Sequence, residues 1–226
     1  MFTTLNFAIS GADGSFDRFP VPIDRLVIAG WTGRDRAKLE EHIEELKELG
    51  VAPPETTPVY YPLSAGLLTQ GDAIQVLGNG SSGEVEAMLV GTPRGMLVTL
   101  ASDHTDREAE AYSIQISKQM CPKPVARAAW WFRDVADRWD SLTLQSWQDG
   151  GVYQDGDCTA MLPPLEIVMG ACGADELPAG WAMPLGTLPV HGGIRGGNRF
   201  AMRLSDPATG RRIHHAYSVE VLGMTK

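Results

Sequence analysis

Three shortages narrow the kinds of protein that this chain of 226 residues can be. It has only 3 cysteines, an odd number without a Cys-x-x-Cys pair, so it encodes neither a disulfide framework nor a structural zinc site. Its apolar runs are far shorter than the roughly 20 residues that cross a bilayer. Basic residues are also scarce, because 19 Lys and Arg stand against 28 Asp and Glu, and a net charge of −9 disfavours phosphate backbones. We therefore expect no nucleic-acid partner and no membrane partner.

What the chain does contain is typical of a globular protein. Hydrophobic residues make up 43% of it, and a chain of this length can bury roughly 70% of its unfolded surface. The first residues show no basic region leading into an apolar stretch, so we expect no secretory signal. Together with the cysteine usage, this predicts a cytoplasmic protein.

Short apolar segments separated by turn residues predict a protein built mainly from strands. Glycine-rich turns bound segments such as 84–90 and 96–100, in the manner of hairpins. Strands outnumber helices and do not alternate with them regularly. The fold class is therefore α+β, mainly β, and not a doubly wound sheet.

The clearest helix is expected after Thr32, because Asp35 three residues later resembles a capping box. Leucine and isoleucine then recur at helical spacing, and Gly50 stands where a helix C′ glycine belongs. Further helices are expected over 106–119, 130–139 and 165–170.

Two short acidic motifs could bind a metal ion. Glu84 and Glu86 alternate on a predicted strand, so their carboxylates share one face about 7 Å apart. Asp103 comes just after the end of the next predicted strand. An all-carboxylate set suits Mg²⁺ or Mn²⁺. The alternative from spacing alone is that the Glu-Val-Glu segment is the solvent-facing side of an ordinary strand.

A histidine and a lysine could supply acid–base chemistry. His42 and Glu45 are three residues apart on the predicted helix, where a carboxylate can orient an imidazole. The alternative is a surface histidine on a charged helix. From its position in the sequence alone, Lys118 is likewise more typical of a solvated lysine than of a catalytic one.

Taken in order, these features resemble the fumarylacetoacetate hydrolase superfamily, and within it a prokaryotic branch catalogued as a domain of unknown function. The resemblance spans roughly residues 20–190. It is carried by Gly30 after a strand, His42-x-x-Glu45, Tyr61-Pro62-Leu63-Ser64, Glu84-x-Glu86, Asp103 with Arg107, Lys118, and Gly186-Thr187-Leu188-Pro189.

The resemblance implies one domain over 1–226, a mixed β-roll with a few peripheral helices. Residues 1 to about 55 would form an N-terminal strand–helix portion, and 56–226 the metal-binding β-roll. Tyr61 stands where the family often has a lysine, so the pocket that selects the substrate is expected to differ.

The resemblance also implies a role for each site residue. Mg²⁺ (or Mn²⁺) would bind Glu84, Glu86 and Asp103, and a small 2-oxo acid would bind the ion. The catalytic residues would be His42, Glu45 and Lys118, the first two as a general-base pair towards water. The substrate-binding residues would be Arg107, Gly186 and Thr187.

The expected reaction is hydrolysis of a C–C bond in an acylpyruvate-like substrate through an enolate. Decarboxylation of an oxaloacetate-type substrate, isomerisation, dehydration, or a non-catalytic metal-stabilised binding protein remain alternatives. The family is commonly dimeric, so a homodimer is expected. Trp130, Trp131 and Trp139 could supply an apolar interface patch or belong to the core.

Overall fold

The computed structural model describes residues 2–48 and 53–223. Within helix α1 (Arg36–Glu48) it leaves out the side chains of four residues, namely His42, Glu45, Leu46 and Glu48.

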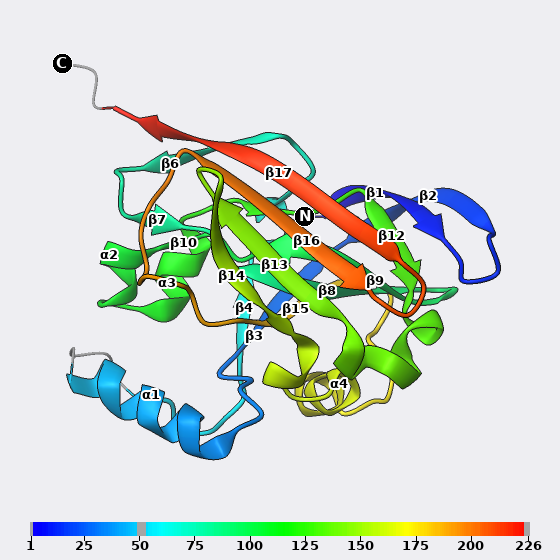
Figure 1. Cartoon of the computed structure of the whole chain (residues 1–226), viewed down its shortest axis with the longest axis horizontal. Helices are drawn as coiled ribbons and strands as arrows, with labels where there is room; N and C mark the ends of the chain where they lie inside the picture. The colour runs from blue at the N-terminus through cyan, green and yellow to red at the C-terminus, as the bar shows by residue number, and fades with distance from the viewer. Residues whose placement is uncertain (1, 49–52, 224–226) are drawn as a thin grey trace.

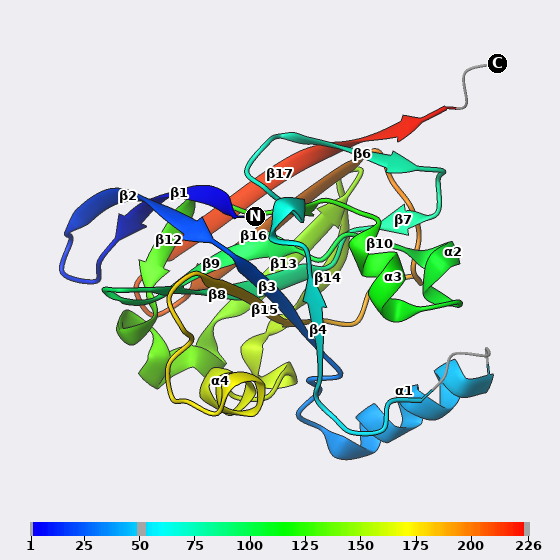
Figure 2. The same cartoon turned by 180° about the vertical axis from the view of Figure 1, so that it is seen from behind.

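The largest element is a mixed sheet with the strand order β2-β1-β12-β9-β8-β15-β3-β4 (Figures 1 and 2). The pairs β1–β12 and β15–β3 are parallel, and the other neighbours are antiparallel. Its strands are β1 (Thr3–Ser10), β2 (Phe16–Ile23), β3 (Arg25–Gly30), β4 (Val59–Leu63), β8 (Val85–Thr92), β9 (Gly95–Ser102), β12 (Ala128–Trp131) and β15 (Trp181–Thr187).

A five-stranded sheet covers one face of the larger sheet (Figure 1). Its order is β14-β13-β16-β17-β6, antiparallel except for the parallel pair β17–β6. These strands are β6 (Ala73–Leu77), β13 (Thr143–Gln148), β14 (Gly151–Asp157), β16 (Arg199–Asp206) and β17 (Arg211–Leu222).

Short elements connect the two sheets. Two small ladders pair β7 (Ser81–Ser82) with β10 (Thr105–Asp106), and β5 (Leu68–Thr69) with β11 (Lys123–Pro124). The remaining α-helices are α2 (Arg107–Glu110), α3 (Ile114–Gln119) and α4 (Pro164–Cys172). Short 3₁₀ turns are η1 (Ala65–Leu67), η2 (Phe132–Asp134), η3 (Ala136–Ser141) and η4 (Cys158–Ala160).

Alternation along the central strands divides the core into two clusters. Val85 and Leu89 of β8 pack between the two sheets with residues such as Phe200 of β16. Met88 and Val90 point to the opposite face of the larger sheet and join a second cluster. Every residue of β8 is buried, because both faces of this strand are covered.

The prediction of a mainly β, α+β protein is confirmed, and several local expectations are corrected. Asp35, not Thr32, caps α1, since its Oδ1 accepts the backbone N–H of Ala37 at 3.1 Å. The Thr32 hydroxyl instead donates to the carbonyl of Leu185. The expected helix over 106–119 is two helices, because Ser113 caps a new one at Ile114. Gly50 lies outside the described residues.

The expected helix over 130–139 is wrong. Trp130 and Trp131 lie on β12, paired with β9, and 3₁₀ turns follow. Trp130, Trp131 and Trp139 are all buried in the cores of the chain, so they form no exposed apolar patch. Strands β2 and β15 were not anticipated, because proline and glycine interrupt their apolar pattern.

The strands of the N-terminal portion do not form a separate sheet. β1 pairs with β12, and β3 pairs with β15, so they share the larger sheet with β8, which carries Glu86, and with β9, which Asp103 follows. Among the described residues, no helix is both long and apolar enough to span a membrane.

Candidate active site

The antiparallel register of β8 and β9 brings the three predicted metal ligands together. Val85 is paired with Ser102, and just beyond this pair the backbone N–H of Asp103 donates to the carbonyl of Glu84 at 3.0 Å. Residues opposite each other on adjacent strands have Cβ atoms about 5 Å apart. Glu86, two residues after Glu84, lies on the same face. The site therefore lies at the end of the β8–β9 hairpin remote from its turn.

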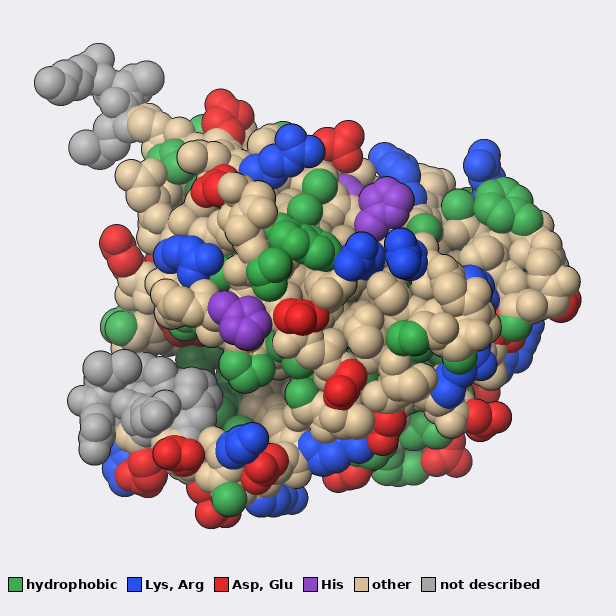
Figure 3. Space-filling model, in the orientation of Figure 1, with side chains coloured by type: hydrophobic (Ala, Val, Ile, Leu, Met, Phe, Trp, Pro, Cys, Tyr) green, Lys and Arg blue, Asp and Glu red, His purple; other side chains and the backbone are tan. Residues whose placement is uncertain are grey.

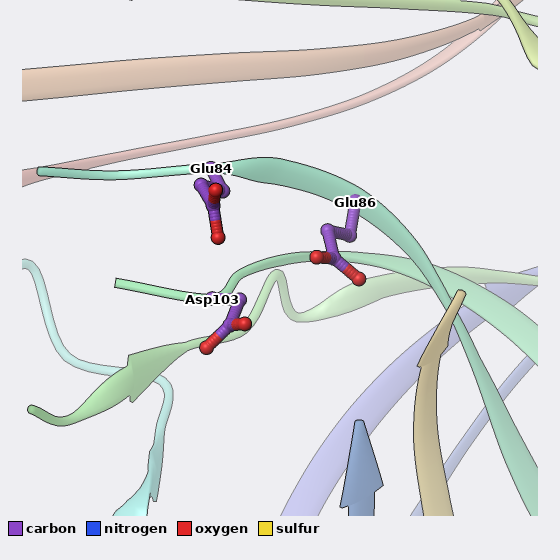
Figure 4. Close-up of side chains that lie close together, drawn as sticks. All are labelled: Glu84, Glu86 and Asp103. Atoms are coloured by element: carbon purple, nitrogen blue, oxygen red, sulfur yellow. The ribbon is translucent and has the colours of Figure 1, made fainter. Parts of the chain in front are cut away.

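The three carboxylates converge closely (Figure 4). Glu84, Glu86 and Asp103 each offer one oxygen, and these oxygens lie within 4.8 Å of one another. Glu86 and Asp103 are buried, with exposed fractions of 2% and 1%, whereas Glu84 is partly exposed. A hard, all-oxygen set of this kind suits Mg²⁺ or Mn²⁺.

Two lysines contact this group of carboxylates. Lys118 of α3 places its Nζ 2.5 Å from Asp103 Oδ2 and 3.6 Å from Glu84 Oε2. Lys123 of β11 places its Nζ 2.9 Å from Asp103 Oδ1. The sequence prediction included Lys118 but missed Lys123. Nothing in the segment Pro122-Lys123-Pro124 distinguishes a buried lysine from a solvated one, since its burial follows from the pairing of β11 with β5.

Burial and neighbouring charges shift the pKa values of Glu86 and Asp103 in opposite directions. Burial, with the nearby charges of Asp103 and Glu84, raises the pKa of Glu86 well above its usual range. Burial also favours a higher pKa for Asp103, but Lys118 and Lys123 outweigh it and lower that pKa. Among the described residues, Glu86 has no ion-pair partner, and its carboxylate accepts the backbone N–H of Gly186 at 2.8 Å.

The pKa values of the two lysines also shift in opposite directions. Burial favours a lower pKa for Lys118, but Asp103 and Glu84 outweigh it and raise that pKa. For Lys123 burial dominates and lowers the pKa, although Asp103 opposes this effect. Lys118 is therefore firmly a cation at neutral pH.

The structure places Arg107, predicted to bind substrate, behind Glu84. Its Nη2 lies 3.0 Å from Glu84 Oε1, its Nη1 lies 2.8 Å from Glu110 Oε2, and its Nε donates to Ser82 Oγ at 2.8 Å. The described guanidinium contacts are thus with protein oxygens. They fix the orientation of the Glu84 carboxylate.

Gly186 and Thr187, also predicted to bind substrate, border the site from β15. Gly186 has φ +103°, and a Cβ there would collide with the Thr32 hydroxyl, so only glycine suits this position. Its N–H is the donor that orients Glu86. The Thr187 hydroxyl donates to the carbonyl of Val85 at 2.8 Å and accepts from the side-chain amide of Gln154.

A neutral network supports the site from the five-stranded sheet. The Tyr217 hydroxyl lies 2.8 Å from Ser102 Oγ and 2.9 Å from His104 Nδ1, and His104 Nε2 lies 2.9 Å from Ser81 Oγ. Burial, followed by the charges of Lys123 and Arg107, lowers the pKa of His104 to about 3, so the imidazole is neutral at pH 7. The sequence did not predict this role for Tyr217, which lies 115 residues from Ser102.

His42 and Glu45 lie on α1, at the same end of the molecule as α2 and α3 (Figures 1 and 2). Their side chains are outside the part of the chain that the structure describes. Their assignment as a general-base pair therefore stays a prediction.

Comparison with known proteins identifies the chain at the level of the family. A family model described as "Protein of unknown function (DUF2848)" matches residues 29–217. The chain belongs to this family. No curated protein matches this DUF2848 chain.

Solved structures resemble the DUF2848 chain over nearly its whole length. A fumarylacetoacetate hydrolase family protein from yeast, ynq8, is 16% identical, with 90% of this chain and 96% of that chain covered and a TM-score of 0.64. A protein from Burkholderia cenocepacia, provisionally named a fumarylpyruvate hydrolase, is 18% identical, with 97% and 92% covered and a TM-score of 0.62.

A third similar structure is named as an isomerase, whereas the first two are named as hydrolases. The 5-carboxymethyl-2-hydroxymuconate delta-isomerase from Mycobacterium smegmatis is 16% identical, with 93% of this chain and 88% of that chain covered and a TM-score of 0.63. Likenesses at this level of identity show the fold. The DUF2848 chain therefore has the fumarylacetoacetate hydrolase fold, and the resemblance seen in its sequence is confirmed.

Proposed function

We propose that this protein is a divalent-metal-dependent enzyme that acts on a small 2-oxo acid through an enolate. The proposed reaction is hydrolysis of a C–C bond in an acylpyruvate-like substrate. The observation that carries the proposal is Glu86, a buried carboxylate without an ion-pair partner among the described residues, facing Glu84 and Asp103. A buried charge normally has a partner or binds a metal ion, so Glu86 supports a metal site.

In this proposal Glu84, Glu86 and Asp103 hold Mg²⁺ or Mn²⁺. The ion, when bound, supplies Lewis acidity towards the oxygens of the 2-oxo acid. Lys118 and Lys123 keep Asp103 ionised, and Gly186 and Arg107 orient the other two carboxylates. The Lys118 ammonium offsets negative charge that develops on the substrate. His42, oriented by Glu45, activates a water molecule as general base.

Hydrolysis and the alternative reactions are separated by their products. Solved relatives with this fold carry both hydrolase and isomerase names, so the fold accommodates more than one outcome. Hydrolysis of an acylpyruvate yields two carboxylic acids, decarboxylation yields carbon dioxide, and isomerisation leaves the mass unchanged. Mass analysis of the products therefore assigns the reaction once turnover is found.

The first experiment is thermal unfolding of EDTA-treated protein with and without Mg²⁺ or Mn²⁺, followed by addition of oxalate. A ligand at 100 times its Kd stabilises the folded state by about 2.7 kcal/mol. For a protein of this size that raises Tm by roughly 5–10 °C. We expect a metal-dependent rise that oxalate enlarges.

Two glutamate variants, one in the site and one as a control, test whether the rise in Tm comes from the carboxylates. Glu86→Gln should abolish the metal-dependent rise in Tm, whereas Glu176→Gln, an exposed carboxylate in the loop after α4, should leave it unchanged. An absence of any shift with either ion in the wild-type protein, or an equal shift in Glu86→Gln, would contradict the proposed metal site.

A further inference from the structure

A cleft of about 310 Å³ opens at the end of the molecule that carries α1 and α3. Its walls are Trp31 after β3, Val59 and Tyr61 of β4, Ile114 of α3, and the segment 54–56. Figure 3 shows the surface hollowed between the α1 region and the body of the molecule. A volume of this size is at the lower end of the range for small-molecule sites.

Helix α3 connects the cleft with the group of carboxylates. Ile114 lines it, and Lys118 follows one turn later on the same side of α3, in contact with Asp103. A hydrogen bond joins α3 to β4, since the Gln115 side chain donates to the carbonyl of Pro62 at 2.9 Å. Burial raises the pKa of Tyr61, and the charges of Lys118 and Asp103 also act on it. One turn of α3 therefore separates a residue of the cleft wall from a residue that contacts the carboxylates.

Two aromatic rings in the cleft wall are held in place. Trp31 Nε1 donates to the Tyr61 hydroxyl at 3.0 Å. Trp31 has φ +56°, a left-handed conformation that costs an ordinary residue about 1–2 kcal/mol. A Cβ on Gly30 would lie 2.8 Å from the Tyr61 ring, so the absence of a side chain at Gly30 leaves room for that ring. Strain of this kind tends to persist where a side chain is needed for function.

The chemistry of the lining favours an uncharged ligand group. Trp31, Val59, Tyr61 and Ile114 present apolar surface, and Glu55 is the single charged group among the described lining residues. A carboxylate in this cleft would meet no cationic partner among those residues, and it would be repelled by Glu55. An apolar, flat group would gain contact with both rings.

We propose that the Trp31–Tyr61 cleft binds an apolar, uncharged tail of the substrate, and so selects 2-oxo acids with alkyl or aryl tails over those with a second carboxylate. This inference rests on the proposed function, because the 2-oxo acid end is placed at Glu84, Glu86 and Asp103. It adds the class of substrate that the site accepts.

The test is isothermal titration calorimetry of the Mg²⁺-loaded protein with four unreactive probes. Oxalate and pyruvate report on the chelating end alone, 2-oxo-4-phenylbutanoate adds an apolar tail, and 2-oxoglutarate adds a carboxylate. One methylene in an apolar pocket changes binding by roughly 10-fold or more. We expect 2-oxo-4-phenylbutanoate to bind at least 10-fold more tightly than pyruvate, and 2-oxoglutarate to bind no more tightly than pyruvate.

Failure of the two proposals gives different results. If no probe binds, the proposed function itself is wrong. If oxalate and pyruvate bind but the phenyl tail brings no gain, or 2-oxoglutarate binds most tightly, the proposed function stands and the inference about the cleft is overturned.

Charge-introducing variants test the cleft directly. Tyr61→Lys should reduce the affinity for 2-oxo-4-phenylbutanoate roughly 10-fold and raise that for 2-oxoglutarate, while Tyr112→Lys, at a tyrosine that is 84% exposed, should change neither. Because Tyr61 is partly buried, Glu55→Arg at an exposed position provides a second variant with less risk to folding, with Glu176→Arg as its control. If oxalate affinity is retained and neither variant moves the ratio of the two affinities, the cleft does not hold the tail.

Discussion

Two buried aspartates in this protein show how a structural ion pair differs from a candidate active site. Asp206, at the end of β16, is fully buried, and its carboxylate lies 2.7 Å from Arg138 Nη2 and 3.6 Å from Arg211 Nη2. The Thr209 hydroxyl and the backbone N–H of Ala208 complete its hydrogen bonds. Asp103 is buried as deeply and also has two cationic partners.

The difference lies in the other acids nearby. The described groups that contact the Asp206 carboxylate are all hydrogen-bond donors. Burial favours a higher pKa for Asp206, but Arg138 and Thr209 outweigh it and lower that pKa to about 2. Around Asp103 two further carboxylates approach within 4.8 Å, and one of them, Glu86, has a raised pKa. Burial and ion pairing are therefore common to both places, whereas crowding of like charges marks the candidate active site. Such crowding is unfavourable to folding and is typical of functional sites.

The largest effect is expected when Asp103 is neutralised. Asp103→Asn leaves Lys118 and Lys123 in the interior with no carboxylate directly between them, and their side chains are 9% and 1% exposed. Removing one partner of a buried ion pair costs about 3–5 kcal/mol. We expect a loss of that size in the free energy of unfolding, measured by urea denaturation in EDTA. A loss below about 1 kcal/mol would show that the lysines are solvated or neutral in the folded protein.

Asp206→Asn should lower the free energy of unfolding less than Asp103→Asn, although both aspartates are buried and have two cationic partners. Its partners Arg138 and Arg211 have side chains that are 30% and 17% exposed, so water can replace part of the lost interaction. Hydrogen bonds to charged groups contribute roughly 1.5–3 kcal/mol, and we expect a loss in that range. The metal-dependent rise in Tm should be unchanged in this variant. If it disappears, the two regions are coupled and the comparison between them fails.

The smallest effect is a difference in pH dependence. The folded-state pKa of Asp206 lies near 2, below its unfolded value of about 3.9. The ionised carboxylate therefore stabilises the folded protein above about pH 4, and this stabilisation is lost as pH falls. The full contribution to the free energy of unfolding is about 2.6 kcal/mol, of which about half is lost by pH 3. Glu86 has the opposite sign, since a raised pKa makes it destabilise the metal-free protein as pH rises above about 4.3.

Unfolding in EDTA across pH 3–8 measures both contributions. Relative to wild type, the stability deficit of Asp206→Asn should shrink by about half towards pH 3, while Glu86→Gln should gain stability towards pH 8. Parallel curves for wild type and Glu86→Gln would mean that Glu86 is ordinarily ionised and hydrated in the folded state.

Parts of this site were predictable because they depend on local geometry. The period of two along a strand puts Glu84 and Glu86 on one face, and a polar aspartate after the next strand indicated Asp103 as their partner. The short helix that carries Lys118 was anticipated only approximately, since Ser113 divides it from α2. Lys123 and Tyr217 could not be predicted, because their roles arise from the pairing of β11 with β5 and from a contact between the two sheets.

The sequence by itself determined that the protein is mainly β, that it carries an acidic pair on one strand face, and that it resembles the fumarylacetoacetate hydrolase superfamily. These properties follow from alternation, turn residues and the order of motifs along the chain. The tertiary structure decided which charges are buried together, which are neutralised, and that Trp31, Tyr61 and Ile114 form one apolar cleft. Those outcomes depend on strand register and on contacts between distant segments, where burial strengthens each charge interaction and local sequence carries no record of the partner.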